Sequence, residues 1–96
     1  MDFVFEVVDK SGRKIHLSNE RLKHILRHND INFNHLEDVK SALIRPTYTI
    51  LQAFDKTKGN YYFYNKQMKS YLLVVVKYLN GKGFVLTAFF TKNIQK

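Results

Sequence analysis

Two histidines one helical turn apart are the residues in this sequence whose types and spacing most directly suggest catalysis. The stretch that holds them has apolar residues at helical spacing, namely Leu22, Ile25 and Leu26. At about 100° per residue, His24 and His28 fall on the far side of that helix, with Arg21 beside His28. Two imidazoles and a guanidinium therefore share a face that the core does not need.

Imidazole suits acid–base chemistry near neutral pH because its unperturbed pKa is about 6.5. The reaction that fits is cleavage of RNA through its own 2′-hydroxyl group. One group removes the hydroxyl proton, another protonates the departing 5′ oxygen, and a cation stabilises the charge of the phosphorane. The spacing does not decide which of His24 and His28 is the acid and which the base.

Two other interpretations of the histidine pair stay open. Histidines on a polar helix face are most often only solvated. Alternatively, two histidines four residues apart on a helix can hold zinc. The segment has Arg27 between its histidines and no glutamate there, and the chain has no cysteine, which leaves only His16 and His35 as weak further ligands. We therefore expect no metal and no cofactor.

A lysine and two threonines of the C-terminal half form a second group. Lys77 interrupts a strand that is otherwise apolar, so it must either reach water or meet an anion. Thr87 and Thr91 alternate with apolar residues and share one face of their strand. The structural alternatives are a lysine that extends to solvent and threonines that only favour strand formation.

Tyrosines of the segment 58–66 are candidates for stacking on bases. Tyr62 and Tyr64 share one face of the expected strand, whereas Tyr61 and Phe63 share the other. An exposed aromatic ring that stacks on a base contributes about 1 to 3 kcal/mol. Core packing explains one of the two faces equally well.

Helix signals precede a long β region. We expect a first helix over Asn19–His28, with Ser18 as its N-cap. Asn34 and Glu37 resemble a capping box for a second helix, which Pro46 ends.

Strand patterns lie on both sides of the helices. Strands are expected at Phe3–Val8, Lys14–Leu17, Tyr48–Phe54, Tyr61–Tyr64, Tyr71–Leu79 and Phe84–Phe90. The Asn80-Gly81 pair predicts a tight hairpin between the last two. The order ββ-αα-ββββ predicts one α+β domain over residues 1–96, with an antiparallel sheet and the helices on one of its faces.

The charge of the chain points to a polyanionic partner. Sixteen Lys and Arg against eight Asp and Glu give a net charge of +8 with neutral histidines. Neutralised phosphates release counterions, which drives binding of nucleic acid. Solubility alone is the other explanation, because small domains commonly carry about 2 to 8 net charges.

The composition also bears on location. The absence of cysteine is compatible with the cytoplasm. The longest apolar run, Tyr71–Val76, is far too short to span a bilayer, and no signal peptide is recognisable. We expect a cytoplasmic protein without a membrane partner.

Several segments together resemble a known family. They are Ser18–His28, Ile44-Arg45-Pro46, Tyr61-Tyr62, Leu73–Lys77 and Thr87–Thr91. In kind and order they are similar to the phage- and mobile-element-associated branch of the barnase–EndoU–colicin–RelE ribonuclease superfamily. The resemblance covers about residues 9–94.

The resemblance implies two helices packed on a four-stranded antiparallel sheet, with the active site between the first helix and the sheet. By position it implies His24, His28, Lys77 and Thr87 as catalytic residues. It adds phosphate contacts by Arg21, Arg45 and Thr91. Arg27 and Tyr62 are further candidate RNA-binding residues. It also implies an acidic antitoxin as a partner.

The sequence therefore predicts a metal-independent endoribonuclease, the toxin of a toxin–antitoxin pair, that acts on RNA. Phe89 stands where many members of the family have tyrosine, which favours the alternative of a non-catalytic RNA-binding domain. A further alternative is a basic module that binds an acidic protein.

Overall fold

The computed structural model describes residues 3–28, 30–52 and 55–94, except for the side chain of His28. In chain order, the helices and strands within these residues are β1 Phe3–Val8, β2 Lys14–Ser18, α1 Asn19–His28, the 3₁₀ helix η1 Phe33–His35, α2 Leu36–Ile44, β3 Tyr48–Leu51, β4 Lys58–Asn65, β5 Ser70–Leu79 and β6 Lys82–Thr91.

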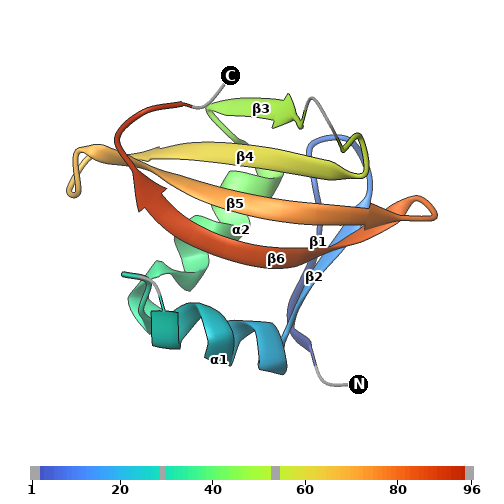
Figure 1. Ribbon diagram of the computed structural model, residues 1–96, viewed down its shortest axis with the longest axis horizontal. Helices are drawn as coiled ribbons and strands as arrows, with labels where there is room; N and C mark the ends of the chain where they lie inside the picture. Colours follow the sequence, from blue (N-terminus) through green and yellow to red (C-terminus); the bar gives the residue numbers. More distant parts are fainter. Residues whose placement is uncertain (1–2, 29, 53–54, 95–96) are drawn as a thin grey trace.

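The strands form one six-stranded mixed sheet in the order β1-β2-β6-β5-β4-β3 (Figure 1). Neighbouring strands are antiparallel except β2 and β6, which pair in parallel between Lys14–His16 and Lys82–Phe84. The four-stranded antiparallel sheet predicted from the sequence is therefore wrong. The N-terminal hairpin joins the sheet, because β6 has an edge that would otherwise lack backbone partners.

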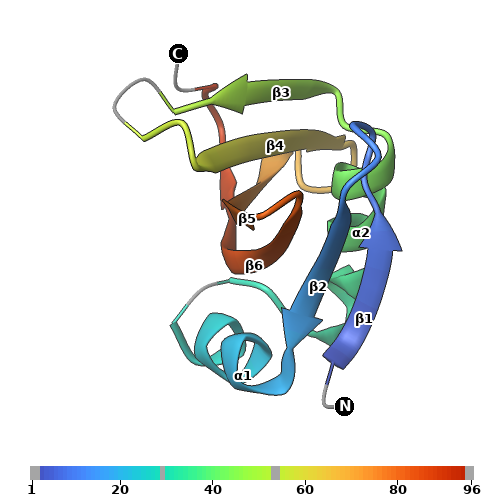
Figure 2. The same ribbon diagram turned by 90° about the vertical axis from the view of Figure 1, so that its right-hand side faces the viewer.

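The two helices occupy different places around the sheet. α2 packs against β4 and β5 and also against β1, whereas α1 packs against β6 and β2. In both views α1 lies below β6, next to the C-terminal end of β2 (Figures 1 and 2). Side chains of both helices belong to the same buried core, although α1 packs at the β6–β2 part of the sheet and α2 at the β4–β5 part.

Local sequence signals explain the ends of the elements. The Ser18 hydroxyl accepts a hydrogen bond from the Arg21 N–H (3.1 Å), and α1 covers the residues predicted for it. The predicted cap of the second helix is wrong: Asn32 caps η1, and its own N–H donates to His35 Nδ1 (3.1 Å). The hairpin at Asn80-Gly81 is confirmed, with φ values of 52° and 80°.

The core lies between the sheet and both helices. The helices contribute Leu22 and Ile25 from α1 and Val39, Ala42 and Leu43 from α2. The strands contribute, among others, Ile15, Tyr61, Leu72, Val74, Val76, Val85 and Ala88. Among the described residues, no helix is long and apolar enough to cross a membrane.

The opposite face of the sheet points away from α2, and we call it the distal face. Residues directly across from one another on paired strands share a face. On that basis the distal face consists of Tyr62 and Tyr64 on β4, Tyr71, Leu73, Val75 and Lys77 on β5, and Thr87, Phe89 and Thr91 on β6. Lys77 and Thr87 therefore lie on the same face of neighbouring strands.

Gly83 is required where β2 joins β6. A Cβ at this position would lie 2.8 Å from Ile15 Cδ1 and 2.9 Å from the Lys77 carbonyl oxygen. Gly83→Ala should lower the free energy of unfolding by about 1 to 3 kcal/mol, because the backbone of a central strand has to move. Urea denaturation measures this change. Lys82→Ala at the neighbouring exposed position is the control, and equal loss in both variants would contradict the packing explanation.

Candidate functional site

The polar side of α1 is the first candidate site. Arg21, Lys23, His24 and Arg27 are exposed on it, and we call these four residues the basic face of α1. Together with Glu20 they line a polar pocket of about 320 Å³. Leu22 and Ile25, on the other side of the helix, are buried in the core. The helix thus presents three permanent cations and an imidazole against a single carboxylate.

The second predicted histidine, His28, is the last residue of α1. Its side chain lies outside the part of the chain that the structure describes. The expected pairing of two imidazoles therefore stays a prediction.

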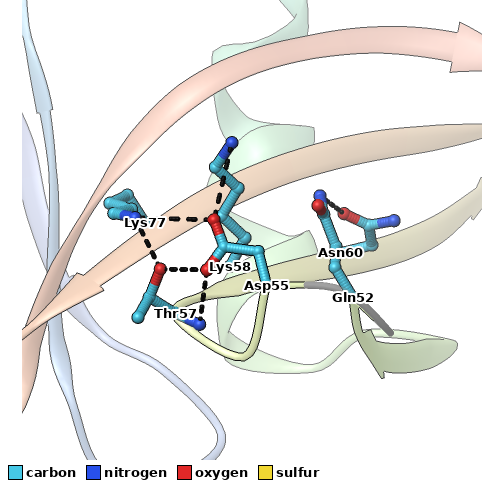
Figure 3. A network of polar contacts seen from close by, with 6 residues as sticks. All are labelled: Gln52, Asp55, Thr57, Lys58, Asn60 and Lys77. Carbon is cyan, nitrogen blue, oxygen red and sulfur yellow. Dashed lines mark hydrogen bonds and ion pairs between the residues drawn. The ribbon is translucent and has the colours of Figure 1, made fainter.

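Lys77 meets an anion, which was one of the two outcomes expected from the sequence. Its Nζ lies 3.6 Å from Asp55 Oδ2 and donates a hydrogen bond to the Thr57 hydroxyl (Figure 3). Lys58 Nζ lies 3.8 Å from the same carboxylate oxygen. Two ammonium groups share one carboxylate, so the cluster keeps one net positive charge.

The Asp55 carboxylate of this cluster is held in its ionised form. The Thr57 hydroxyl and the Thr57 N–H both donate hydrogen bonds to it, and the latter bond is 3.0 Å long. These bonds, followed by the charges of Lys77 and Lys58, lower the pKa of Asp55 below its ordinary value. Asp55 and Thr57, which precede β4, therefore both contact the Lys77 ammonium group near the end of β5.

The remaining predicted residues fall in separate places. Thr87 and Thr91 lie on the distal face, where the Thr91 hydroxyl donates to the carbonyl of Asn93 (3.2 Å). Arg45 is exposed at the C-terminal end of α2, next to β3, whereas α1 lies beside β6 (Figure 1). Tyr62 has no exposed surface, so the prediction that its ring stacks on a base is wrong: the ring packs edge-on against Tyr71, with 6.3 Å between centroids.

The structure does not bring the predicted residues of α1 into one pocket with Lys77 and Thr87. Among the described residues, the pocket at the basic face is lined by α1 alone. β6, which carries Thr87, lies between α1 and β5, which carries Lys77. The basic face and the Lys77 cluster are therefore two positively charged areas on either side of one strand.

A second pocket, which the sequence did not predict, lies between the β1–β2 turn and β3. It has a volume of about 410 Å³, and we call it the Tyr78 pocket. Pro46, Tyr48 and Leu51 supply apolar walls, and Arg13 and Tyr78 supply polar groups. Its size and mainly apolar lining are typical of small-molecule sites.

A buried hydrogen-bond network underlies the Tyr78 pocket. Asp9 is 5% exposed, and its Oδ1 accepts from the Ser11 N–H (2.9 Å), the Ser11 hydroxyl (2.7 Å) and the Arg13 N–H (2.9 Å). Its Oδ2 accepts from the Tyr61 hydroxyl, whose oxygen lies 2.6 Å from that of Tyr78. Asp9 was not singled out in the sequence analysis, because nothing in the sequence links it to a tyrosine 52 positions later.

The network shifts the pKa values of its members apart. Burial alone would raise the pKa of Asp9, but the hydrogen bonds from Tyr61, Ser11 and Arg13 outweigh it and lower that pKa. Burial, together with the hydrogen bond to Asp9, raises the pKa of Tyr61 far above its ordinary value. Burial also raises the pKa of Tyr78. At neutral pH Asp9 is therefore a carboxylate, and both tyrosines keep their protons.

Comparison with protein-family models, with curated proteins and with solved structures finds no match. The described residues also contain no group of three or more His, Asp or Glu side chains placed to hold a metal ion.

Proposed function

We propose that this chain is a metal-independent endoribonuclease, the toxin of a toxin–antitoxin pair acting in the cytoplasm, which binds RNA on the basic face of α1. The supporting observation is an exposed imidazole, His24, within a helix face that carries Arg21, Lys23 and Arg27. Such a face attracts the phosphate backbone, and the imidazole can transfer a proton near neutral pH.

In the proposed reaction the 2′-hydroxyl group attacks the adjacent phosphorus. One of His24 and His28 takes the proton from that hydroxyl, and the other gives a proton to the departing 5′ oxygen. Arg21 stabilises the negative charge that develops on the phosphorane oxygens. Thr87 lies on the distal face and outside the pocket at the basic face, so its hydroxyl is proposed to contact the RNA strand there.

Lys77 has a limited part in this proposal. Its ammonium group already contacts Asp55 and Thr57, so an approaching phosphate has to compete with the Asp55 carboxylate for it. The net positive charge of its cluster still favours an RNA strand that passes over the distal face (Figure 3). The lysine therefore contributes to binding of the strand rather than to the chemical step.

An acidic antitoxin is the proposed protein partner. A partner that covers the basic face of α1 would both neutralise its charge and shield His24 from RNA. Association between oppositely charged surfaces is fast and sensitive to salt.

The direct test is incubation of the purified protein with total RNA in the presence of EDTA. The proposal requires fragments that end in 2′,3′-cyclic phosphate, because attack by the 2′-hydroxyl group forms that end. EDTA inactivates any contaminating nuclease that depends on a metal. Intact RNA, or fragments with other ends, would contradict it.

A non-catalytic RNA-binding domain is the second candidate. Phe89 next to Thr87 on the distal face offers no hydroxyl to a phosphate, and Lys77 is already paired with a carboxylate. RNA that binds in a salt-dependent manner and stays uncut in the same assay would support this candidate.

A further inference from the structure

The direction of the hydrogen bonds in the Tyr78 pocket determines what it can bind. The ionised Asp9 carboxylate only accepts hydrogen bonds, so the Tyr61 hydroxyl must donate its single hydrogen to it. Tyr61 must then accept at the contact with Tyr78, and Tyr78 donates. The hydrogen of Tyr78 is thereby used, and its oxygen keeps only lone pairs for a ligand.

Gly59 allows the Tyr78 hydroxyl to lie directly against the backbone of β4. A Cβ on residue 59 would lie 2.3 Å from the Tyr78 hydroxyl oxygen, so any larger residue would displace it. Tyr61, which is 2% exposed, lines the same pocket. The pocket lining therefore includes a hydrogen-bond acceptor at a fixed position.

The lining of the pocket also carries cations. The Arg13 guanidinium carbon lies 4.4 Å from the centroid of the Tyr78 ring, and one of its N–H groups donates to the Ser11 hydroxyl (2.9 Å). Lys10, also in the lining, is exposed. Asp9 is the carboxylate among the described lining residues, and its oxygens accept hydrogen bonds from Ser11, Arg13 and Tyr61. An anionic group is thus favoured beside Arg13 and Lys10.

The part of the lining that β3 supplies is apolar and open. Tyr48 and Leu51 are 51% and 56% exposed, although both belong to a strand. A flat ring placed against them would cover apolar surface. The ligand that fits these three features has a planar body, a hydrogen-bond donor and an anionic group.

We propose that the Tyr78 pocket binds a nucleoside 5′-monophosphate with an amino-bearing base. The amino group donates to the Tyr78 oxygen, the base lies along Tyr48 and Leu51, and the phosphate meets Arg13 and Lys10. The nucleotide is either free or the 5′-phosphorylated end of an RNA chain, which share this chemistry. The inference is independent of the proposed nuclease activity, because none of its residues belongs to α1.

Isothermal titration calorimetry with adenosine 5′-monophosphate (AMP) tests the proposal. Tyr78→Phe should weaken binding about three- to tenfold, since it removes one neutral hydrogen bond. Arg13→Gln should weaken it about tenfold or more, because a charged contact is lost while the backbone N–H to Asp9 remains. Lys82→Gln, a cation outside the pocket lining, is the matched control and should bind as the parent does.

Changes in the nucleotide test the contact with the Tyr78 oxygen and the contact with Arg13 separately. N6,N6-dimethyl-AMP has no amino hydrogen, so it should bind the parent more weakly than AMP and bind Tyr78→Phe equally to AMP. Adenosine, which lacks the phosphate, should be insensitive to Arg13→Gln.

A 5′-phosphorylated oligoadenylate distinguishes a free nucleotide from the 5′-phosphorylated end of an RNA chain as the ligand. Binding of AMP as tight as that of the oligomer supports a free nucleotide, and much tighter binding of the oligomer supports an RNA end. The proposal is overturned if neither binds, or if binding is the same in the parent, Tyr78→Phe and Arg13→Gln. Thermal melting of each variant confirms that it is folded, and the RNA cleavage assay reports on α1 alone.

Discussion

His24→Ala should lower the rate of RNA cleavage by about 10² to 10⁴-fold, the usual contribution of one positioned acid or base. His24 is exposed, and the core side of α1 is formed by Leu22 and Ile25, so the fold should be retained. Single-turnover cleavage of a labelled RNA in EDTA measures the rate, and circular dichroism checks the fold.

Lys23→Gln is the matched control on the same helix. It removes a charge from the basic face but no proton-transfer group, so it should raise the RNA concentration needed for half-maximal rate and leave the maximal rate nearly unchanged. If His24→Ala cuts RNA at the parental rate, His24 is not a catalytic residue and the proposed site on α1 is wrong.

Asp9→Ala should destabilise the protein by about 3 kcal/mol, because the buried Tyr61 hydroxyl and two backbone N–H groups would lose their acceptor. For a domain of this size that corresponds to a fall in Tm of roughly 12 to 24 °C. Differential scanning calorimetry measures it. Asp9→Asn should cost less, since the amide keeps one acceptor oxygen. Equal stability of Asp9→Ala and the parent would show that the network contributes little.

The same residue predicts how stability depends on pH. The pKa of Asp9 is lower in the folded protein than in the unfolded chain, where it is about 3.9. The unfolded state therefore binds the proton more readily, and the stabilisation by Asp9 is present above that pH and lost as the pH falls through and below it. Urea denaturation at pH 7 and pH 3 should show the parent and Asp9→Asn closer in stability at the lower pH.

The parts of the fold that were predicted correctly depend on neighbours in sequence. α1 begins after the Ser18 cap, and its apolar residues repeat every turn, so its limits could be predicted. The Asn80-Gly81 hairpin requires positive φ at both positions, which these two residues tolerate best. Both signals lie within a few residues of the structure they determine.

The parts that were missed depend on residues far apart in the chain. The parallel pairing of Lys14–His16 with Lys82–Phe84 leaves no local pattern, because a strand alternates in the same way whichever strand it meets. The contact of Asp9 with Tyr61 is equally non-local. A buried tyrosine needs a hydrogen-bond partner, but its sequence neighbours do not reveal which one.

The face of each candidate side chain was more predictable than its surroundings. Alternation correctly placed Thr87 and Thr91 on one face of their strand, and of the two outcomes left open for Lys77 the structure shows contact with an anion. Alternation could not show that Tyr62 is covered completely, since coverage depends on side chains from other strands.

The pairing of β2 with β6 has a consequence for biosynthesis. The second strand of the chain finds its place only against the last one, so the sheet cannot be completed until the C-terminal strand has left the ribosome. A nascent chain that still lacks β6 also lacks most of the surface on which α1 packs, since β2 and β1 supply only the rest of it. The sheet and the packing of α1 are therefore completed together, when β6 joins β2 and β5.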